Sequence, residues 1–164
     1  HALYRELIAL AHAAGKKTIL DSYGPEFAEG LAERPYMVKP NVEEAEKLFG
    51  EPLADRSSQW RAIEAFHARG VELVVLSLGP EGALVSRCGE RFQAIPPAIE
   101  EINAVGSGDS LVAGFAVGIA RGWDLERTAR LAIGAGTANA MSWDIAHFTR
   151  DEAEAIAARV EIRK

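Results

Sequence analysis

The strongest constraint on the fold is one short, uninterrupted apolar segment. Residues 72–77 read Glu-Leu-Val-Val-Leu-Ser, with no alternation of polar and apolar side chains between the two ends. Such a run indicates a strand that is buried on both faces, which is typical of a parallel sheet covered by helices. Further short β-rich or apolar segments predict strands at 17–21, 36–38, 83–86, 91–95 and 160–162.

Helical patterns separate these strands along the chain. Apolar residues at helical spacing, with glycine or capping residues at the ends, predict helices at 2–14, 26–32, 41–49, 57 or 58 to 70, 106–121, 125–143 and from 149 onward. Strands that alternate with helices predict an α/β fold, with a parallel sheet between two helical layers. The 164 residues match the length of one domain, and no repeat, linker or domain boundary is evident.

Composition excludes several classes of protein. A hydrophobic content of 48% is typical of a folded globular chain, and no apolar run of about 18 residues is present to span a membrane. The net charge of −6 argues against broad binding of nucleic acid or anionic membranes, although a local basic site for one phosphate is compatible with it. The single cysteine, Cys88, excludes a disulfide framework, and the four scattered histidines give no support to a zinc site.

The most informative motif is Asn-Ala-Val-Gly-Ser-Gly-Asp-Ser at 103–110. Gly106, Ser107 and Gly108 precede a predicted helix, where backbone N–H groups and the helix dipole favour an anion. Asp109 would then face that anion. The structural alternative is an ordinary loop with Asp109 as the helix cap, and spacing alone does not separate the two interpretations. The dinucleotide fingerprint, the P-loop lysine and the serine-hydrolase elbow are all absent from this motif.

A second motif, Lys-Pro-Asn-Val-Glu-Glu, occupies residues 39–44. Lys39 could hold a phosphate, and Asn41 with Glu44 could organise a hydrated magnesium ion. The structural alternative is that Asn41 and Glu44 form a capping box, and spacing alone favours this alternative.

The third motif, Ser-x-Gly-x-x-Gly at 77–82, directly follows the clearest strand. Ligands of open parallel sheets bind beyond the carboxyl ends of the strands, so a nucleotide could lie here. Taken alone, the motif is a tight turn.

In this order, the three motifs resemble the C-terminal half of the PfkB-family (ribokinase-like) carbohydrate kinases. The segment 105–115 carries most of the resemblance. Its amino-acid sequence, together with Asn139, is similar to that of the branch containing 1-phosphofructokinase and tagatose-6-phosphate kinase. The resemblance implies a doubly wound, ribokinase-like α/β/α sandwich that is incomplete. Residues 1–164 would be the C-terminal nucleotide-binding and catalytic part of a single kinase domain, and the N-terminal strands, the β lid and most sugar contacts would lie outside them.

The resemblance also implies roles for the residues of the first motif. Asp109 would be the catalytic base that accepts the proton of the sugar hydroxyl. The N–H groups of Gly106, Ser107 and Gly108 would form an anion hole for the phosphoryl group. The reaction would be ATP-dependent phosphorylation of a sugar phosphate, with fructose 1-phosphate as the first choice, then tagatose 6-phosphate and fructose 6-phosphate.

The other two motifs would supply the nucleotide site, with ATP and Mg2+ as cofactors. Lys39 would lie near the phosphates, while Asn41 and Glu44 would help to place Mg-ATP. The residues expected to line the nucleotide are Ser77, Gly79 and Gly82, with Asn139 beside the adenine.

One departure from the family pattern is Asn103-Ala104 in place of Asp-Thr, which weakens the case for a potassium site. The resemblance implies a cytoplasmic enzyme and is compatible with a homodimer of the full-length protein. Two alternatives stay open. The chain could be a non-catalytic nucleotide-binding module, or an inactive fragment that leaves an apolar sheet edge exposed.

Overall fold

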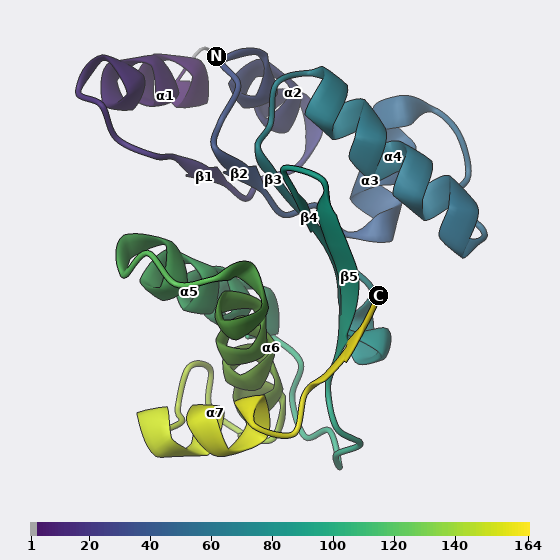
Figure 1. Cartoon of the computed structure of the whole chain (residues 1–164), viewed down its shortest axis with the longest axis vertical. Coiled ribbons are helices and arrows are strands. Elements are labelled where there is room, and N and C mark those ends of the chain that lie inside the picture. The colour runs from purple at the N-terminus through teal and green to yellow at the C-terminus, as the bar shows by residue number, and fades with distance from the viewer. Residues whose placement is uncertain (1–2) are drawn as a thin grey trace. The chain divides into compact units, whose positions relative to one another are not determined.

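The computed structural model describes residues 3–164, which form an α/β fold (Figure 1). The helices are α1 (Leu3–Ala13), α2 (Gly24–Ala32), α3 (Val42–Phe49), α4 (Arg56–Ala68), α5 (Ser107–Ala120), α6 (Leu125–Ala140) and α7 (Arg150–Ala157). The strands are β1 (Ile19–Leu20), β2 (Met37–Val38), β3 (Leu73–Ser77), β4 (Ala83–Arg87), β5 (Glu90–Ile95) and β6 (Glu161–Arg163). None of the helices within this range is long and apolar enough to cross a bilayer.

The strand order is β1-β2-β3-β4-β5-β6, and the sheet is mixed. Strands β1, β2 and β3 are parallel, with Leu20 opposite Val38 and Val38 opposite Val74. Strand β6 pairs antiparallel with β5, with Ile162 opposite Ala94. The predicted closing strand is therefore confirmed, displaced by one residue, and the parallel arrangement expected from the apolar run is confirmed for β1 to β3.

The chain divides into two compact units whose segments interleave. The first comprises residues up to 79 and 84–91, and the second comprises 80–83 and 92–164. That residues 1–164 belong to one kinase domain stays a prediction.

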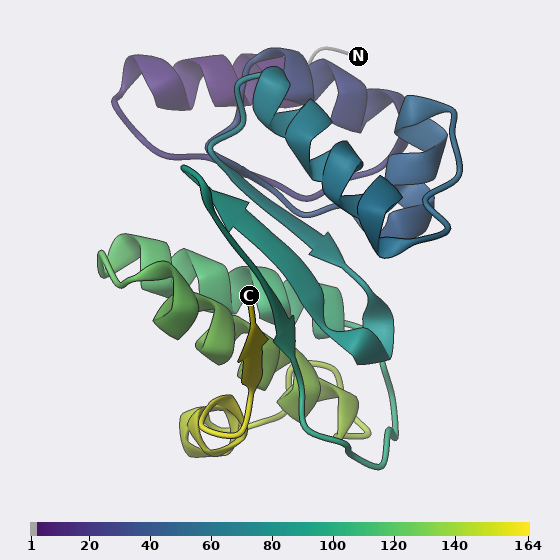
Figure 2. The same ribbon diagram turned by 45° about the vertical axis from the view of Figure 1, so that its right-hand side comes forward.

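The core of the first unit forms because β3 is apolar on both faces. Leu73 to Leu76 are completely buried, as the uninterrupted apolar run predicts. Helix α4 packs on β3 through Phe66, whose ring meets those of Phe27 and Phe49 edge to face at centroid distances of 6.1 and 4.9 Å. Helices α1 and α2 lie side by side (Figures 1 and 2). This packing fixes the carboxyl ends of β1, β2 and β3, where the motif residues of this unit lie.

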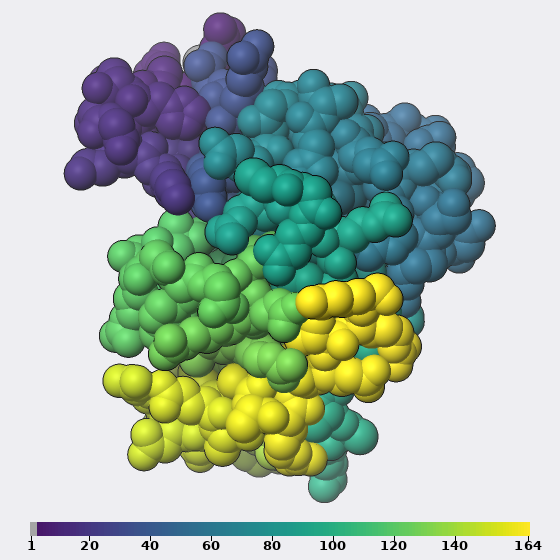
Figure 3. Space-filling model, in the orientation of Figure 1, coloured from purple at the N-terminus to yellow at the C-terminus, as the bar shows by residue number. Residues whose placement is uncertain are grey.

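Helix α1 leaves an apolar stripe uncovered. Leu3, Leu7 and Leu10 are all more than half exposed, and among the described residues of α1 only Ile8 is buried. The segment forms the purple surface in Figure 3. The neighbouring strand β1 stands at one end of the strand order. The inactive-fragment alternative predicts exposed apolar side chains on the strand at a sheet edge. In the structure Leu20 of β1 is buried, and the exposed apolar side chains belong to the neighbouring helix α1.

In the second unit, small residues allow α5 and α6 to pack closely (Figure 2). A Cβ atom on Gly114 would lie 2.4 Å from the Ala132 Cα, and one on Gly118 would lie 2.4 Å from the Thr128 side chain. The richness of α6 in alanine and glycine is therefore explained by packing against other helices. On its other side α6 packs on α7, with a Cβ on Gly134 only 2.4 Å from the Ala153 carbonyl oxygen.

Helix α6 ends at Ala140, three residues before the predicted end at Trp143. The reason is that the Ala140 carbonyl oxygen accepts hydrogen bonds from the N–H groups of Ile102 and Asn103, at 2.8 and 3.1 Å. These bonds satisfy a carbonyl that would otherwise need a further helical turn. They also join the segment before α5 to the end of α6.

Replacing Gly114 with Ala will destabilise the second unit, because the new methyl group overlaps the α6 backbone, which cannot move aside as a flexible side chain could. We expect a loss of about 3 kcal/mol in the free energy of unfolding, at the upper end of overpacking costs. The measurement is a urea titration followed by circular dichroism. Ala116→Ser, on the exposed face of the same helix, is the control and will change stability by less than about 0.5 kcal/mol. A Gly114→Ala protein as stable as wild type would contradict the packing described.

Candidate functional site

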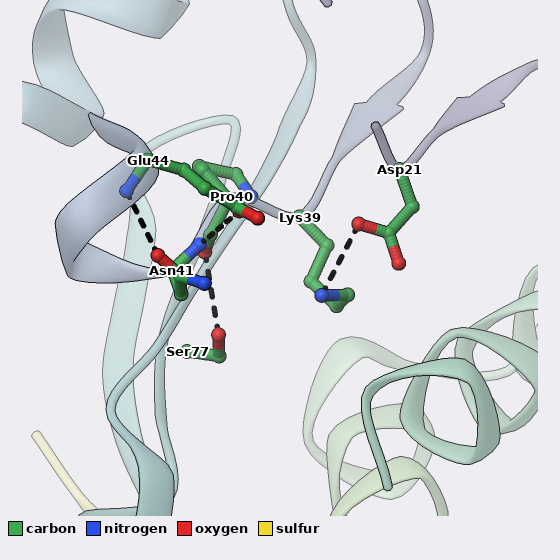
Figure 4. A network of polar contacts seen from close by, with 6 residues as sticks. All are labelled: Asp21, Lys39, Pro40, Asn41, Glu44 and Ser77. Carbon is green, nitrogen blue, oxygen red and sulfur yellow. Dashed lines mark hydrogen bonds and ion pairs between the residues drawn. The ribbon is translucent and has the colours of Figure 1, made fainter. Parts of the chain in front are cut away.

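The first-unit motif residues gather at the carboxyl ends of the parallel strands (Figure 4). Lys39 follows β2, and its Nζ lies 3.2 Å from the Asp21 Oδ1, at the end of β1. The Lys39 side chain is only 8% exposed, and that of Asp21 is 27% exposed. A buried ammonium group needs such a partner, because desolvation without one is costly. Asp21 was missed in the sequence, although it ends the strand predicted at 17–21 just as Lys39 follows the next one.

Asn41 and Glu44 form the capping box that spacing alone favoured. The Asn41 Oδ1 accepts a hydrogen bond from the Glu44 N–H at 2.8 Å, and the Glu44 Oε2 accepts one from the Asn41 N–H at 2.9 Å. No hydrogen bond within residues 3–164 is made by the other Glu44 carboxylate oxygen, which leaves an oxygen ligand for a cation. Among the described residues no group of three or more His, Cys, Asp and Glu side chains could hold a metal ion. Mg2+ would therefore have to take most of its ligands from phosphates and water.

Replacing Asn41 with Ala will lower the stability of the chain by about 1 kcal/mol, because the N-terminal amides of α3 lose their cap. Asn41→Ser retains a capping oxygen and will stay within about 0.5 kcal/mol of wild type. Urea midpoints of the two variants measure the difference. Equal losses in both would show that the side chain stabilises the protein by something other than the cap.

Ser77 joins this group through the backbone. Its N–H donates to the Pro40 carbonyl oxygen at 3.0 Å, and its hydroxyl donates to the same oxygen at 3.4 Å. Gly79 has a φ of 59°, and a Cβ there would meet no atom within 4 Å. The first unit thus brings Lys39, Asn41, Glu44 and Ser77 together at one edge of the sheet.

Gly82 belongs to the second unit, where packing explains it. Its φ is 85°, and a Cβ atom would lie 2.0 Å from the Ala94 carbonyl oxygen. Beside it, the Gln93 side chain donates a hydrogen bond to the Glu81 carbonyl oxygen at 3.0 Å. The turn is therefore fixed against β5 whether or not it contacts a ligand.

The 103–110 motif forms the start of α5, with Gly106 as the N-cap residue. Gly106 has a φ of 82°, and a Cβ on it would lie 2.5 Å from the Ile145 Cγ2, so both conformation and space require glycine. Asp109 lies in the first turn and is exposed. It is not the helix cap, so the structural alternative for this residue is wrong: the cap position is occupied by a glycine that has no side chain to accept from the helix amides.

The amides of this loop are not equivalent. The Ser107 N–H donates to the Ala104 carbonyl oxygen at 3.1 Å. The N–H groups of Gly106 and Gly108 have no hydrogen-bond acceptor within residues 3–164. These two amides could therefore bind an anion without breaking an existing hydrogen bond.

Asn139 holds this loop from α6. It is 1% exposed, and its Nδ2 donates to the Val105 carbonyl oxygen at 2.8 Å and to the Ser107 Oγ at 3.0 Å. Its Oδ1 accepts a hydrogen bond from the Ala146 N–H at 2.7 Å. The side chain is committed to the protein, which the pattern of small residues around it in the sequence did not reveal. The signal available in the sequence was one polar amide side chain in a helix segment made mostly of alanine and glycine.

Comparisons with known proteins agree on the family. The profile of the pfkB family carbohydrate kinases matches residues 1–156. The chain is 43% identical over 129 residues to a 1-phosphofructokinase of Rhodobacter capsulatus, an alignment that covers 79% of this chain and 41% of that protein. It is 32% identical over 162 residues to a tagatose-6-phosphate kinase of Staphylococcus epidermidis, covering 97% of this chain and 52% of that protein.

Solved structures give the same fold. The structure of Arabidopsis thaliana ribokinase complexed with ribose and ATP superposes with a TM-score of 0.84 at 25% identity, covering 94% of this chain and 52% of the ribokinase. The ribokinase-like fold expected from the sequence is thereby confirmed. The chain spans about half the length of the curated relatives it matches.

Proposed function

Because the chain belongs to the pfkB family of carbohydrate kinases, we propose that it supplies the ATP site and the catalytic base of a sugar-phosphate kinase. The observation that carries this proposal is the start of α5. There an exposed carboxylate, Asp109, stands in the first helical turn, and two preceding glycine amides have no acceptor within the described residues. A base and an anion-binding loop are the two parts that phosphoryl transfer to a hydroxyl requires.

Asp109 would accept the proton of the attacking hydroxyl. The transition state of phosphoryl transfer is loose, so the hydroxyl loses its proton late and a strongly basic carboxylate is not needed. An exposed aspartate can therefore fill the role. Its exposure leaves it accessible to a substrate hydroxyl.

The Gly106 and Gly108 amides would receive the phosphoryl oxygens. Backbone donors at a helix start are already oriented, so they stabilise the developing charge without reorganisation. The Ser107 amide could join them only by leaving the Ala104 carbonyl oxygen.

Lys39, Asn41 and Glu44 would act on the nucleotide phosphates. The Lys39 ammonium can pair with a phosphate while Asp21 retains contact with it, because an ammonium group has three donors. Mg2+, when bound, would neutralise phosphate charge. We assign the free Glu44 oxygen as the protein group that binds the hydrated ion. Asn41 holds the Glu44 side chain in place through the capping box. Ser77, Gly79 and Gly82 would line the nucleotide.

The acceptor we propose is a phosphorylated ketose, with fructose 1-phosphate first and tagatose 6-phosphate second, the order suggested by the curated relatives. The test is a panel of fructose 1-phosphate, tagatose 6-phosphate and fructose 6-phosphate with Mg-ATP, assayed on the protein that carries this chain. The highest kcat/KM is expected with fructose 1-phosphate. If all three phosphosugars are inert and a non-phosphorylated sugar reacts, the proposed acceptor class is wrong.

The second candidate is a nucleotide-binding module without catalysis, which would use Lys39, Asn41 and Glu44 at the carboxyl ends of the parallel strands in the same way. Calorimetric titration of the 164-residue chain with Mg-ATP, followed by an assay with fructose 1-phosphate, separates the candidates. Binding without transfer, both in this chain and in the protein that carries it, would favour the module.

A further inference from the structure

One buried amide connects three segments at the start of α5. Asn139 contacts Val105 before the helix, Ser107 in its first turn and Ala146 in the loop after α6. Its two amide protons and its carbonyl oxygen all have partners, so the group is fully satisfied although it is 1% exposed.

The loop that Asn139 holds needs such a restraint. Gly106 allows the backbone its φ of 82°, but glycine also gives the unrestrained chain more conformations than any other residue. The exposed side chain of Val105 contributes little packing of its own. Anion-binding amides stabilise a transition state only when they are held in place beforehand. A buried hydrogen-bond network is one way to hold them.

We propose that Asn139 is a positioning residue for phosphoryl transfer, fixing the Gly106 and Gly108 amides and orienting the Ser107 hydroxyl as a further donor. This inference rests on the proposed function. The Ser107 Oγ accepts a hydrogen bond from the Asn139 Nδ2, so its own proton remains free to donate elsewhere. Accepting one bond strengthens the next bond that a hydroxyl donates. Asn139 thus acts on the phosphoryl group through the loop and does not touch it.

The geometry accounts for the choice of asparagine. The site needs donors toward Val105 and Ser107 and an acceptor toward Ala146, all from one short side chain. Aspartate would place an oxygen against the Val105 carbonyl oxygen unless it were protonated. On the preceding part of α6, a Cβ on Gly136 would lie 3.0 Å from the Ser107 carbonyl oxygen, so glycine there lets the loop approach the helix closely.

The test compares Asn139→Asp and Asn139→Ala in the protein that carries this chain. We expect kcat at neutral pH to fall about 100-fold in both, the usual effect of a small misplacement of catalytic groups. The KM for ATP should change less than about threefold, since the nucleotide contacts stay in place. In Asn139→Asp, kcat should recover as the pH falls, because burial raises the pKa of the new carboxyl and its protonated form donates to Val105. Asn139→Ala should show no such recovery.

A control on the same helix and an activity-independent measurement complete the experiment. The control is Thr137→Val. Thr137 is also buried on α6, two residues before Asn139, and this variant should retain kcat within about twofold of wild type. Hydrogen exchange in the Asn139→Ala protein should quicken about tenfold or more at the Ser107 and Ala146 amides, and not in the Thr137→Val protein. Unchanged exchange at both amides, or an Asn139→Ala kcat within threefold of wild type, would overturn the inference. A wild-type protein without any transfer activity would instead overturn the proposed function, whereas the exchange rates report on the restraint of the loop alone.

Discussion

Replacing Asp109 with Asn will lower kcat for phosphoryl transfer by about 10³-fold, within the range that a positioned general base contributes. Asparagine has nearly the same shape and cannot accept the hydroxyl proton. The dissociation constant for Mg-ATP, measured by calorimetry, should stay within about threefold of wild type because the proposed phosphate contacts are made by other residues. The fold should persist, since Asp109 is exposed and makes no cap.

Asp124→Asn is the matched control for this substitution. Asp124 caps α6 by accepting the Arg127 N–H at 2.8 Å, and asparagine is an equally good N-cap residue. This variant should therefore retain wild-type kcat and stability. If Asp109→Asn keeps wild-type kcat as well, Asp109 is not the base.

Replacing Lys39 with Met will lower kcat/KM for ATP by about 10²- to 10³-fold, the size of effect seen when a charge-stabilising group is removed from a transition state. Methionine fills a similar volume at this buried position. Its partner Asp21 is partly exposed and can remain hydrated, so the folded state should survive. Steady-state kinetics with varied Mg-ATP measure the effect.

Lys47→Met provides the control for the loss of a lysine. Lys47 is exposed on α3 and pairs with Glu43 at 2.7 Å, which holds the pKa of the Glu43 carboxyl below its usual range and raises that of Lys47. Exposed pairs of this kind contribute little, so kinetics and stability should hardly change. If the Lys39→Met protein is less stable but has an unchanged kcat/KM for ATP, the prediction is wrong and the Lys39–Asp21 ion pair serves only the stability of the fold.

Much of the fold could be predicted because local signals and tertiary packing agree. The apolar run at 72–77 indicated a buried strand, and β3 is buried as a whole except at Ser77. The end of α6 could not be predicted, since its apolar pattern continues to Trp143. What ends the helix is a pair of long-range hydrogen bonds from Ile102 and Asn103, which no local pattern encodes.

The candidate site was predictable in its motifs and less so in its contacts. The capping box of Asn41 and Glu44 follows from spacing, because both partners lie within one helical turn. The ion pair of Lys39 with Asp21 and the bonds of Asn139 depend on which strands and helices become neighbours. The position of Asn139 beside the adenine stays a prediction, whereas the hydrogen bonds of its side chain to Val105, Ser107 and Ala146 could not be read from the sequence.

The most direct test of this account is a single-turnover transfer from ATP labelled at the γ-phosphate, using the protein that carries this chain and fructose 1-phosphate as acceptor. The account predicts that the label appears in a sugar bisphosphate with wild-type protein, and that its transfer is about 10³-fold slower with Asp109→Asn. Label that stays in ATP, although ATP and the sugar phosphate are both bound, would contradict it.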